Sequence, residues 1–268
     1  RVLSMYSDPE QRETEIKNIS SVYKTLADEI LPQLRRARLT ANYDVIGRSD
    51  EEINEAFDTD AKVLSANELL YAATLTNDKA RQEAIYKKTT ELYPNDFRAY
   101  NNLGMMAYAN GDFTTAENYF KQAASKDANA PEVNTNLGYI ELVKGNVANA
   151  ETYLSKSTGA NTANEALGNL YIKQGQYDRA VQAFGDTKTN SAALAQILAK
   201  DYNKAKNTLN AVKNPDAYTD YLMAIVGART NNADLVKTSM AKVAQKDATL
   251  AAKAQIDREF AKYANEIK

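Results

Sequence analysis

The chain has 268 residues, enough for one large domain or two small ones with a substantial buried core. It carries 33 Lys and Arg against 35 Asp and Glu, for a net charge of -2, and this balance argues against a nucleic-acid-binding protein. Cys, His and Trp are absent, which excludes disulfides, thiol nucleophiles, His-based acid–base catalysis and metal sites built from nitrogen or sulfur ligands.

The sequence contains no segment that predicts membrane insertion. No apolar run approaches the roughly 20 residues that span a bilayer, and residues 1–6 do not form a signal peptide. Because the chain begins with Arg, we expect a mature form or a fragment, so the lack of a targeting segment in this sequence does not argue against secretion. The lack of Cys is compatible with the cytosol and with an oxidising envelope, so it leaves the compartment open.

The N-terminal segment, residues 1–60, is predicted to contain one helix and one strand. Asp8-Pro9-Glu10 opens a helical pattern of apolar residues that Pro32 ends. Polar and apolar residues then alternate over 36–45, RARLTANYDV, which predicts a half-buried strand. No second strand is predicted to pair with it. Either the chain is a fragment that lacks the other strands, or the strand pairs with another chain, or the segment is not a strand.

Residues 61–268 carry an internal repeat. The columns Gly104, Gly111, Ala116 and Phe120 recur 34 residues later, then after a further 30, and in a weaker form after a further 25. The later copies are Gly138, Gly145, Ala150 and Leu154, then Gly168, Gly175, Ala180 and Phe184. In the weaker copy, Lys200, Tyr202, Ala205 and Leu209 follow Gly175, Tyr177, Ala180 and Phe184 by 25 residues. A period of this size is typical of a solenoid, in which each unit buries its apolar face against its neighbours.

Each copy predicts two helices joined by a turn. Tyr100, Leu103, Gly104 and Ala107 lie at i, i+3, i+4 and i+7, which is one face of a helix, and residues 116–123 repeat this spacing. Between them, Asn110-Gly111-Asp112 predicts a turn in which Asp112 caps the second helix. We expect Gly104 and Ala116 to lie where the two helices cross, with Phe120 filling the adjoining space.

Degenerate copies extend the array in both directions. Residues 63–96 match several columns, and 216–229 with 233–244 predict a further helix pair around Asn231-Asn232. Residues 248–267 predict a final helix. The expected array therefore has about five to six helix pairs and a C-terminal capping helix, with atypical terminal units.

The repeat columns resemble those of the tetratricopeptide repeat family. The family pattern of a large residue, Leu-Gly, a turn Gly, Ala, an aromatic residue and Ala is matched by Tyr100, Leu103-Gly104, Gly111, Ala116, Phe120 and Ala123. Ala128 departs from it, because the family has Pro there, and Leu69-Leu70 replaces Leu-Gly in the preceding copy. The resemblance implies a mainly α fold, a right-handed α-solenoid joined to a small N-terminal helix–strand segment, and a non-enzymatic scaffold for protein–protein interaction.

A second resemblance involves residues 27–53 and 67–78. These runs, ADEILPQLRRARLTANYDVIGRSDEEI and NELLYAATLTND, are similar to envelope proteins of Bacteroidetes in which an OmpA-like region precedes tetratricopeptide repeats. This similarity implies that residues 1–60 are the remnant of an OmpA-like domain, in the bacterial periplasm or associated with the outer membrane. The strand 36–45 would then pair with the missing N-terminal part of its own precursor, which would also hold the peptidoglycan-binding residues.

The predicted partner-binding surface consists of first-helix residues outside the core columns. They combine aromatic, amide and charged side chains, which suit an extended peptide or a partner helix. These residues are Asn67, Tyr71, Arg98, Asn101, Met105, Tyr108, Glu132, Thr135, Tyr139, Leu142, Glu165, Asn169 and Lys173. The alternative function is a peptidoglycan- or glycan-associated envelope protein in which the repeats are a spacer or a dimerisation module.

Other candidate sites have simpler explanations. The acidic residues Glu51-Glu52, Asp58 and Asp60 lack a Gly-containing ligand loop, so we interpret them as solvated helix starts or loops. Arg35, Arg36 and Arg38 are interpreted mainly as a solvated strand face rather than an anion site. A clamp for a C-terminal carboxylate, known in the family, is not expected, because Glu132 and Asn136 stand where it needs basic residues. We therefore expect no catalytic, cofactor or metal site.

Overall fold

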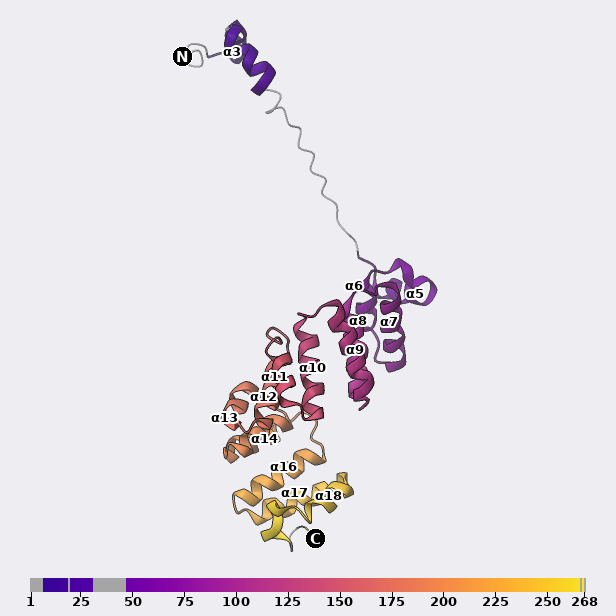
Figure 1. Ribbon diagram of the computed structural model, residues 1–268, viewed down its shortest axis with the longest axis vertical. Helices are drawn as coiled ribbons and strands as arrows, with labels where there is room; N and C mark the ends of the chain where they lie inside the picture. Colours follow the sequence, from indigo (N-terminus) through magenta and orange to yellow (C-terminus); the bar gives the residue numbers. More distant parts are fainter. Residues whose placement is uncertain (1–6, 19, 31–46, 266, 268) are drawn as a thin grey trace. The chain divides into compact units, whose positions relative to one another are not determined.

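The structure, a computed structural model, describes residues 7–18, 20–30, 47–265 and 267, and divides into two compact units between Arg48 and Ser49. The ordered elements in these ranges are helices joined by short turns (Figure 1), and no strand occurs in them. The strand predicted over 36–45 and the Arg residues at 35, 36 and 38 lie outside the described ranges.

The first unit is helical where it is described. It contains α2 (Pro9–Asn18), α3 (Ser20–Thr25) and a π-helical turn, η1 (Leu26–Ile30). The backbone N–H of Glu10 donates to Asp8 Oδ1 at 3.2 Å, so Asp8 begins the helix as the sequence predicts. These residues confirm the helix predicted ahead of Pro32.

The second unit begins with α5 (Asp50–Asp60). Ser49 and Glu52 cap this helix reciprocally, each side chain accepting a hydrogen bond from the other's backbone N–H. Ile53 of α5 is buried in the same apolar cluster as Leu64 and Leu69. Ala56 and Phe57 of α5 pack against this cluster as well, so the compact unit includes α5 and starts ahead of residue 61, the boundary placed from the sequence.

Six antiparallel helix pairs follow within residues 66–246, each helix contacting the next along the chain. The short 3-10 helix η2 (Ala61–Val63) connects α5 to them. The pairs are α6 (Ala66–Ala72) with α7 (Lys79–Leu92), α8 (Phe97–Ala109) with α9 (Phe113–Lys126), α10 (Pro131–Lys144) with α11 (Val147–Leu154), α12 (Ala163–Lys173) with α13 (Tyr177–Phe184), α14 (Asn190–Leu198) with α15 (Tyr202–Asn210), and α16 (Ala217–Arg229) with α17 (Ala233–Lys246). First helices of successive pairs also touch, as α8 with α10 and α10 with α12.

The repeated Gly column marks the crossing point of each central pair, as predicted. A Cβ on Gly104 would lie 2.5 Å from the ring of Phe120, and one on Gly138 would lie 2.5 Å from Leu154. A Cβ on Gly168 would likewise lie 2.5 Å from the ring of Phe184. The absence of a side chain on the first helix thus makes room for the large side chain on the second.

The turns of the five pairs from α8 to α17 each contain a residue with positive φ. Gly111 and Gly145 have φ of 77° and 81°, a region that glycine enters without strain, whereas Lys200 adopts φ of 65° in the equivalent turn. Asp112 Oδ1 accepts a hydrogen bond from the backbone N–H of Thr115 at 3.0 Å, which confirms the predicted cap of α9.

The C-terminal end differs from the single helix predicted over 248–267. α18 (Ala248–Ala254) ends early, and a 3-10 helix, η3 (Arg258–Tyr263), follows it. Asp257 causes the break, because its carboxylate caps η3 and also accepts a hydrogen bond from the hydroxyl of Tyr221. Phe260 and Tyr263 of η3 are buried against α16 and α17, so these last elements close the apolar core.

Candidate functional site

The first helices α6, α8, α10 and α12 carry the residues predicted to bind a partner, and the structure places these residues in three environments. Asn67, Tyr71, Arg98, Met105, Glu132 and Lys173 are exposed. Tyr108, Tyr139, Glu165 and Asn169 are half-buried. Asn101, Thr135 and Leu142 are buried, with exposed fractions of 9%, 0% and 6%.

A small pocket lies between α8 and α10. Its volume is about 100 Å³, and its lining is mostly apolar. Three of its residues, Met105, Tyr108 and Tyr139, belong to the predicted surface. The pocket is completed by Phe120 from α9, Asn136 from α10 and Thr162, which precedes α12. The structure therefore brings the central aromatic residues of the prediction together and adds side chains from α9, from α10 and from the residue before α12.

The aromatic walls of the pocket support one another. The rings of Tyr108 and Tyr139 are 6.4 Å apart between centroids, and Phe113 packs edge-on against Tyr108 at 5.3 Å. Burial raises the pKa of the Tyr108 phenol, and burial followed by the nearby charge of Glu165 raises that of Tyr139. Both phenols are neutral at physiological pH, so the walls present aromatic surface and hydroxyl groups without charge.

An amide pair connects α8 and α10 beside the pocket. Asn136 Nδ2 donates a buried hydrogen bond of 2.8 Å to Asn101 Oδ1. Thr135, next to Asn136, is turned inward and donates to the backbone carbonyl of Pro131 at 2.8 Å. The Asn101–Asn136 bond consequently holds α8 and α10 in register, whereas the Thr135 hydroxyl is satisfied within α10, and both Asn101 and Thr135 offer little surface to a partner.

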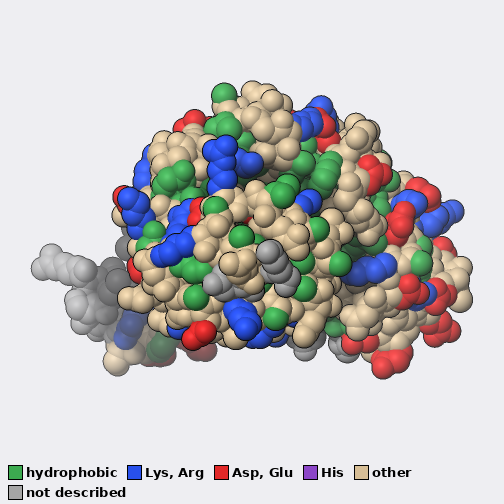
Figure 2. Space-filling model, turned by 90° about the horizontal axis from the view of Figure 1, so that it is seen from below, with side chains coloured by type: hydrophobic (Ala, Val, Ile, Leu, Met, Phe, Trp, Pro, Cys, Tyr) green, Lys and Arg blue, Asp and Glu red, His purple; other side chains and the backbone are tan. Residues whose placement is uncertain are grey.

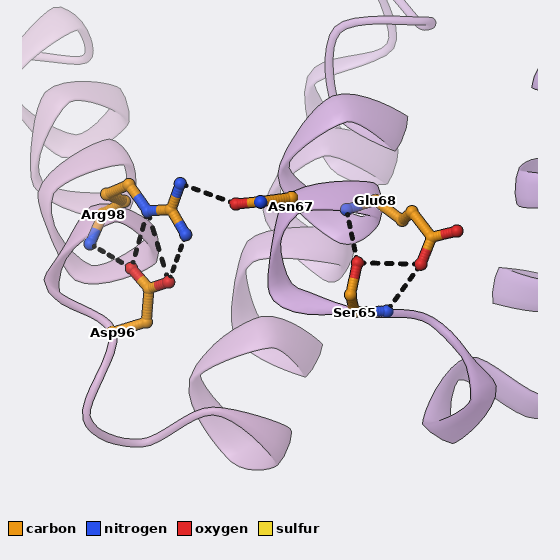
Figure 3. Close-up of polar contacts among 5 residues, drawn as sticks. All are labelled: Ser65, Asn67, Glu68, Asp96 and Arg98. Atoms are coloured by element: carbon orange, nitrogen blue, oxygen red, sulfur yellow. Dashed lines mark hydrogen bonds and ion pairs between the residues drawn. The ribbon is translucent and has the colours of Figure 1, made fainter. Parts of the chain in front are cut away.

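The N-terminal end of the predicted surface is occupied by intramolecular contacts (Figure 3). Arg98 forms an ion pair with Asp96 and donates to Asn67 Oδ1 at 2.9 Å, which joins α8 to α6. Hydrogen bonding with Arg98 lowers the pKa of Asp96, and the same bond raises that of Arg98. Ser65 and Glu68 cap α6 just before Asn67. The charge of Arg98 is therefore already neutralised within the protein.

Tyr71 is also used internally. Its hydroxyl donates to Asp50 Oδ1 at 3.0 Å, linking α6 to α5. The sequence pattern placed Tyr71 outside the core but contained no sign of this partner on another helix.

A second, more polar pocket of about 380 Å³ adjoins Met105 on the side of α7. Lys79, Gln82, Tyr86 and Asn102 supply its polar groups, and Met105 and Met106 contribute thioethers. Gln82 is committed to the fold, because its amide donates to the backbone carbonyls of Ala73 and Thr76. The side chain of Met105 lines both pockets.

The acidic residues that the sequence offered as ligand candidates have structural roles. Glu52 belongs to the cap of α5, and Asp60 accepts from the backbone N–H of Lys62 at 3.2 Å. Asp58 pairs with Arg81 at 2.8 Å. Within the described ranges, no group of three or more acidic, His or Cys side chains is arranged to hold a metal ion.

Charges of both signs are interspersed on the face drawn in Figure 2, together with scattered hydrophobic side chains. This face carries no large patch of basic residues of the kind that binds nucleic acid. None of the helices that the structure describes has both the length and the apolarity that crossing a bilayer requires.

Comparisons with known families identify the repeat. Three models of the tetratricopeptide repeat match the sequence, over residues 102–165, 85–118 and 165–188. These ranges contain the pairs formed by α8 to α13. No curated protein sequence matches the chain.

Solved structures with a similar fold include other helical repeat proteins. A chain of the APC/C hetero-tetramer Cut9-Hcn1 aligns with a TM-score of 0.64 and 15% identity over 80% of this chain and 44% of its own length. A tetratricopeptide repeat protein from Parabacteroides merdae ATCC 43184 aligns with a TM-score of 0.54 and 12% identity, over 81% and 90% of the two chains. PilW, a type IV pilus biogenesis factor, aligns with a TM-score of 0.52 and 18% identity, over 74% and 97%. At these identities the likeness shows the fold alone, and this chain spans less than half of the first structure's chain.

Proposed function

Because residues 85–188 of this chain are tetratricopeptide repeats, we propose that the second unit is a non-enzymatic scaffold that binds a protein or peptide partner on its first-helix face. The observation that carries this proposal is the apolar pocket between α8 and α10, walled by Met105, Tyr108 and Tyr139. Small concavities lined by aromatic and apolar groups are where partner side chains anchor most strongly.

The surroundings of the pocket add polar groups that suit a peptide backbone. Asn169 and Glu165 on α12 lie beside Tyr139, and exposed Glu132 lies in the first turn of α10. An anchor with a polar rim is the usual anatomy of a recognition surface, in which the apolar centre provides affinity and the rim sets register. Asn101, Thr135 and Leu142 are buried, so we expect them to support this surface from below rather than to contact the partner.

Site-specific photo-crosslinking tests the proposal directly. A benzophenone amino acid replaces Glu132, an exposed residue in the first turn of α10, and in a matched control it replaces Ile256, which follows α18 and has an exposed fraction of 85%. We expect a crosslinked protein partner in cells from the Glu132 position and none from the Ile256 position. Tyr108→Ala and Tyr139→Ala should each abolish the crosslink while the far-UV circular dichroism spectrum stays helical. Equal crosslinking from both positions would contradict a dedicated surface.

We further propose the bacterial cell envelope as the location, on the resemblance of residues 27–53 and 67–78 to envelope proteins. Fractionation of cells that express the complete gene product should recover it with the periplasm or the outer membrane. If the complete product binds purified peptidoglycan, and if the Tyr108 and Tyr139 substitutions alter no interaction, the repeats act as a spacer and the scaffold proposal is wrong.

A further inference from the structure

The pocket between α8 and α10 has a size that selects among apolar side chains. A cavity of about 150 Å³ in another protein holds a benzene molecule. The volume here is about 100 Å³, so a branched aliphatic group fits better than an aromatic ring. Phe120 lines the pocket and is itself fully buried, so this part of the lining is closely packed against the core.

The edge of the pocket toward α12 is acidic. Thr162 lines the pocket, and Glu165 follows it in the first turn of α12. Glu165 is half-buried, and its charge acts on the neighbouring Tyr139 hydroxyl. Among the described residues, neither Glu165 nor Glu132 is within 4.0 Å of a basic nitrogen.

The basic groups on the same face do not neutralise this edge. Arg98 is paired with Asp96 at the start of α8. Lys173 lies in the last turn of α12, eight residues after Glu165, which corresponds to about 12 Å along the helix. A carboxylate that is partly desolvated and lacks an ion-pair partner favours a cation from a binding partner.

Building on the function proposed above, we propose that the pocket binds one branched aliphatic side chain of a protein partner and that Glu165 pairs with a Lys or Arg close to it in the partner's sequence. The partner is thus recognised by a short aliphatic–basic segment. The charge of this segment is opposite to that of an acidic peptide or a free C-terminal carboxylate. Glu165 repels both of those ligands.

Selection from a displayed library of random dodecapeptides on the full chain tests this pairing. We expect enrichment of Leu, Ile or Val next to Lys or Arg. Enrichment of acidic or aromatic anchors would overturn the aliphatic–basic assignment and leave the scaffold function standing. Recovery of no binding peptide would count against the scaffold function itself and against this inference with it.

Variants of the two parts of the site give separate readouts with a fluorescein-labelled enriched peptide. Glu165→Gln should weaken binding about two- to five-fold and reduce its salt dependence. Glu151→Gln, a matched change at an exposed position on α11, should have no effect. Met105→Trp should fill the pocket and weaken binding by about ten-fold or more, while Ile256→Trp should not. Binding unchanged by both Glu165→Gln and Met105→Trp would refute the proposal.

A change of pocket size provides a gain-of-function readout. Tyr139→Ala removes one wall, so a library selected on this variant should shift toward Phe and Trp anchors. Circular dichroism and the thermal midpoint establish that the variant is folded. If the folded variant selects the same aliphatic anchors as the wild type, Tyr139 does not limit the size of the bound side chain and the assignment of the pocket fails.

Discussion

Replacing Gly104 with Ala should destabilise the repeat array, even though Ala is the better helix former. The added Cβ would lie 2.5 Å from Phe120 Cε1 and 2.6 Å from Phe120 Cδ1, well inside ordinary van der Waals contact. Phe120 is fully buried, and the pocket of about 100 Å³ that it lines is too small to accept a displaced aromatic ring. The clash can be relieved only if α8 and α9 move apart, which loosens contacts along the whole pair.

The size of the effect follows from two opposing terms. Overpacking a filled core costs about 1–3 kcal/mol, and a contact this short against a fully buried ring belongs in the upper half of that range. Ala in place of Gly within a helix recovers about 1 kcal/mol. The expected net loss is therefore about 1–2 kcal/mol.

Urea unfolding followed by far-UV circular dichroism measures this loss, and a double-mutant cycle assigns its cause. In a Phe120→Ala background the new methyl group meets a cavity, so Gly104→Ala should there be neutral or stabilising by about 0.5–1 kcal/mol. Asn118→Ala, at an exposed position on α9, serves as a control with an expected change within about 0.5 kcal/mol. If Gly104→Ala lowers the free energy of unfolding equally with and without the Phe120 ring, a clash with that ring is not the cause and the reasoning is refuted.

Three further outcomes follow from the same structure. Asn136→Ala leaves the buried Asn101 side chain without its donor and should cost about 1–3 kcal/mol by chemical denaturation, whereas the double Ala variant should cost less than the sum of the single changes. Lys200→Gly relieves a φ of 65° and should raise the stability measured by thermal melting by about 0.5–1 kcal/mol; a lowered midpoint would contradict this. Burial raises the pKa of the Tyr139 phenol above 10.0, so the folded protein binds this proton more tightly than the unfolded chain does. The resulting contribution to the free energy of unfolding is fully present below about pH 10 and is lost as the pH rises further. Tyr139→Phe should make the decline of the urea midpoint above about pH 10 shallower, and an unchanged decline would show that other phenols cause it.

Local features of the chain were predicted well because they depend on neighbouring residues alone. The recurrence of Gly104 and Phe120 predicted the helix pairs and their crossing points, and Asn110-Gly111-Asp112 predicted the turn and the cap of α9. The break between α18 and η3 was missed, because it depends on Asp257 binding Tyr221, a residue distant in sequence.

The candidate site was predicted only in part, for a related reason. The helical period showed that Met105, Tyr108 and Tyr139 point away from the core of their own pairs, and these three residues meet in one pocket. The same period could not show that Asn101 is buried, because its partner Asn136 comes from the next pair. Asn136 and Thr162 were absent from the predicted surface, since neither residue stands out in the repeat pattern.

The sequence by itself therefore determined the helix pairs, most of their turns and the resemblance of residues 85–188 to tetratricopeptide repeats, because periodicity, glycine positions and caps act within a few residues or within one pair. Only the tertiary structure decided which first-helix residues are accessible, which are tied to one another, and where the pocket and its acidic edge lie. Those properties depend on how each repeat is turned against the next, and that rotation arises from packing between pairs rather than from the period of any single helix.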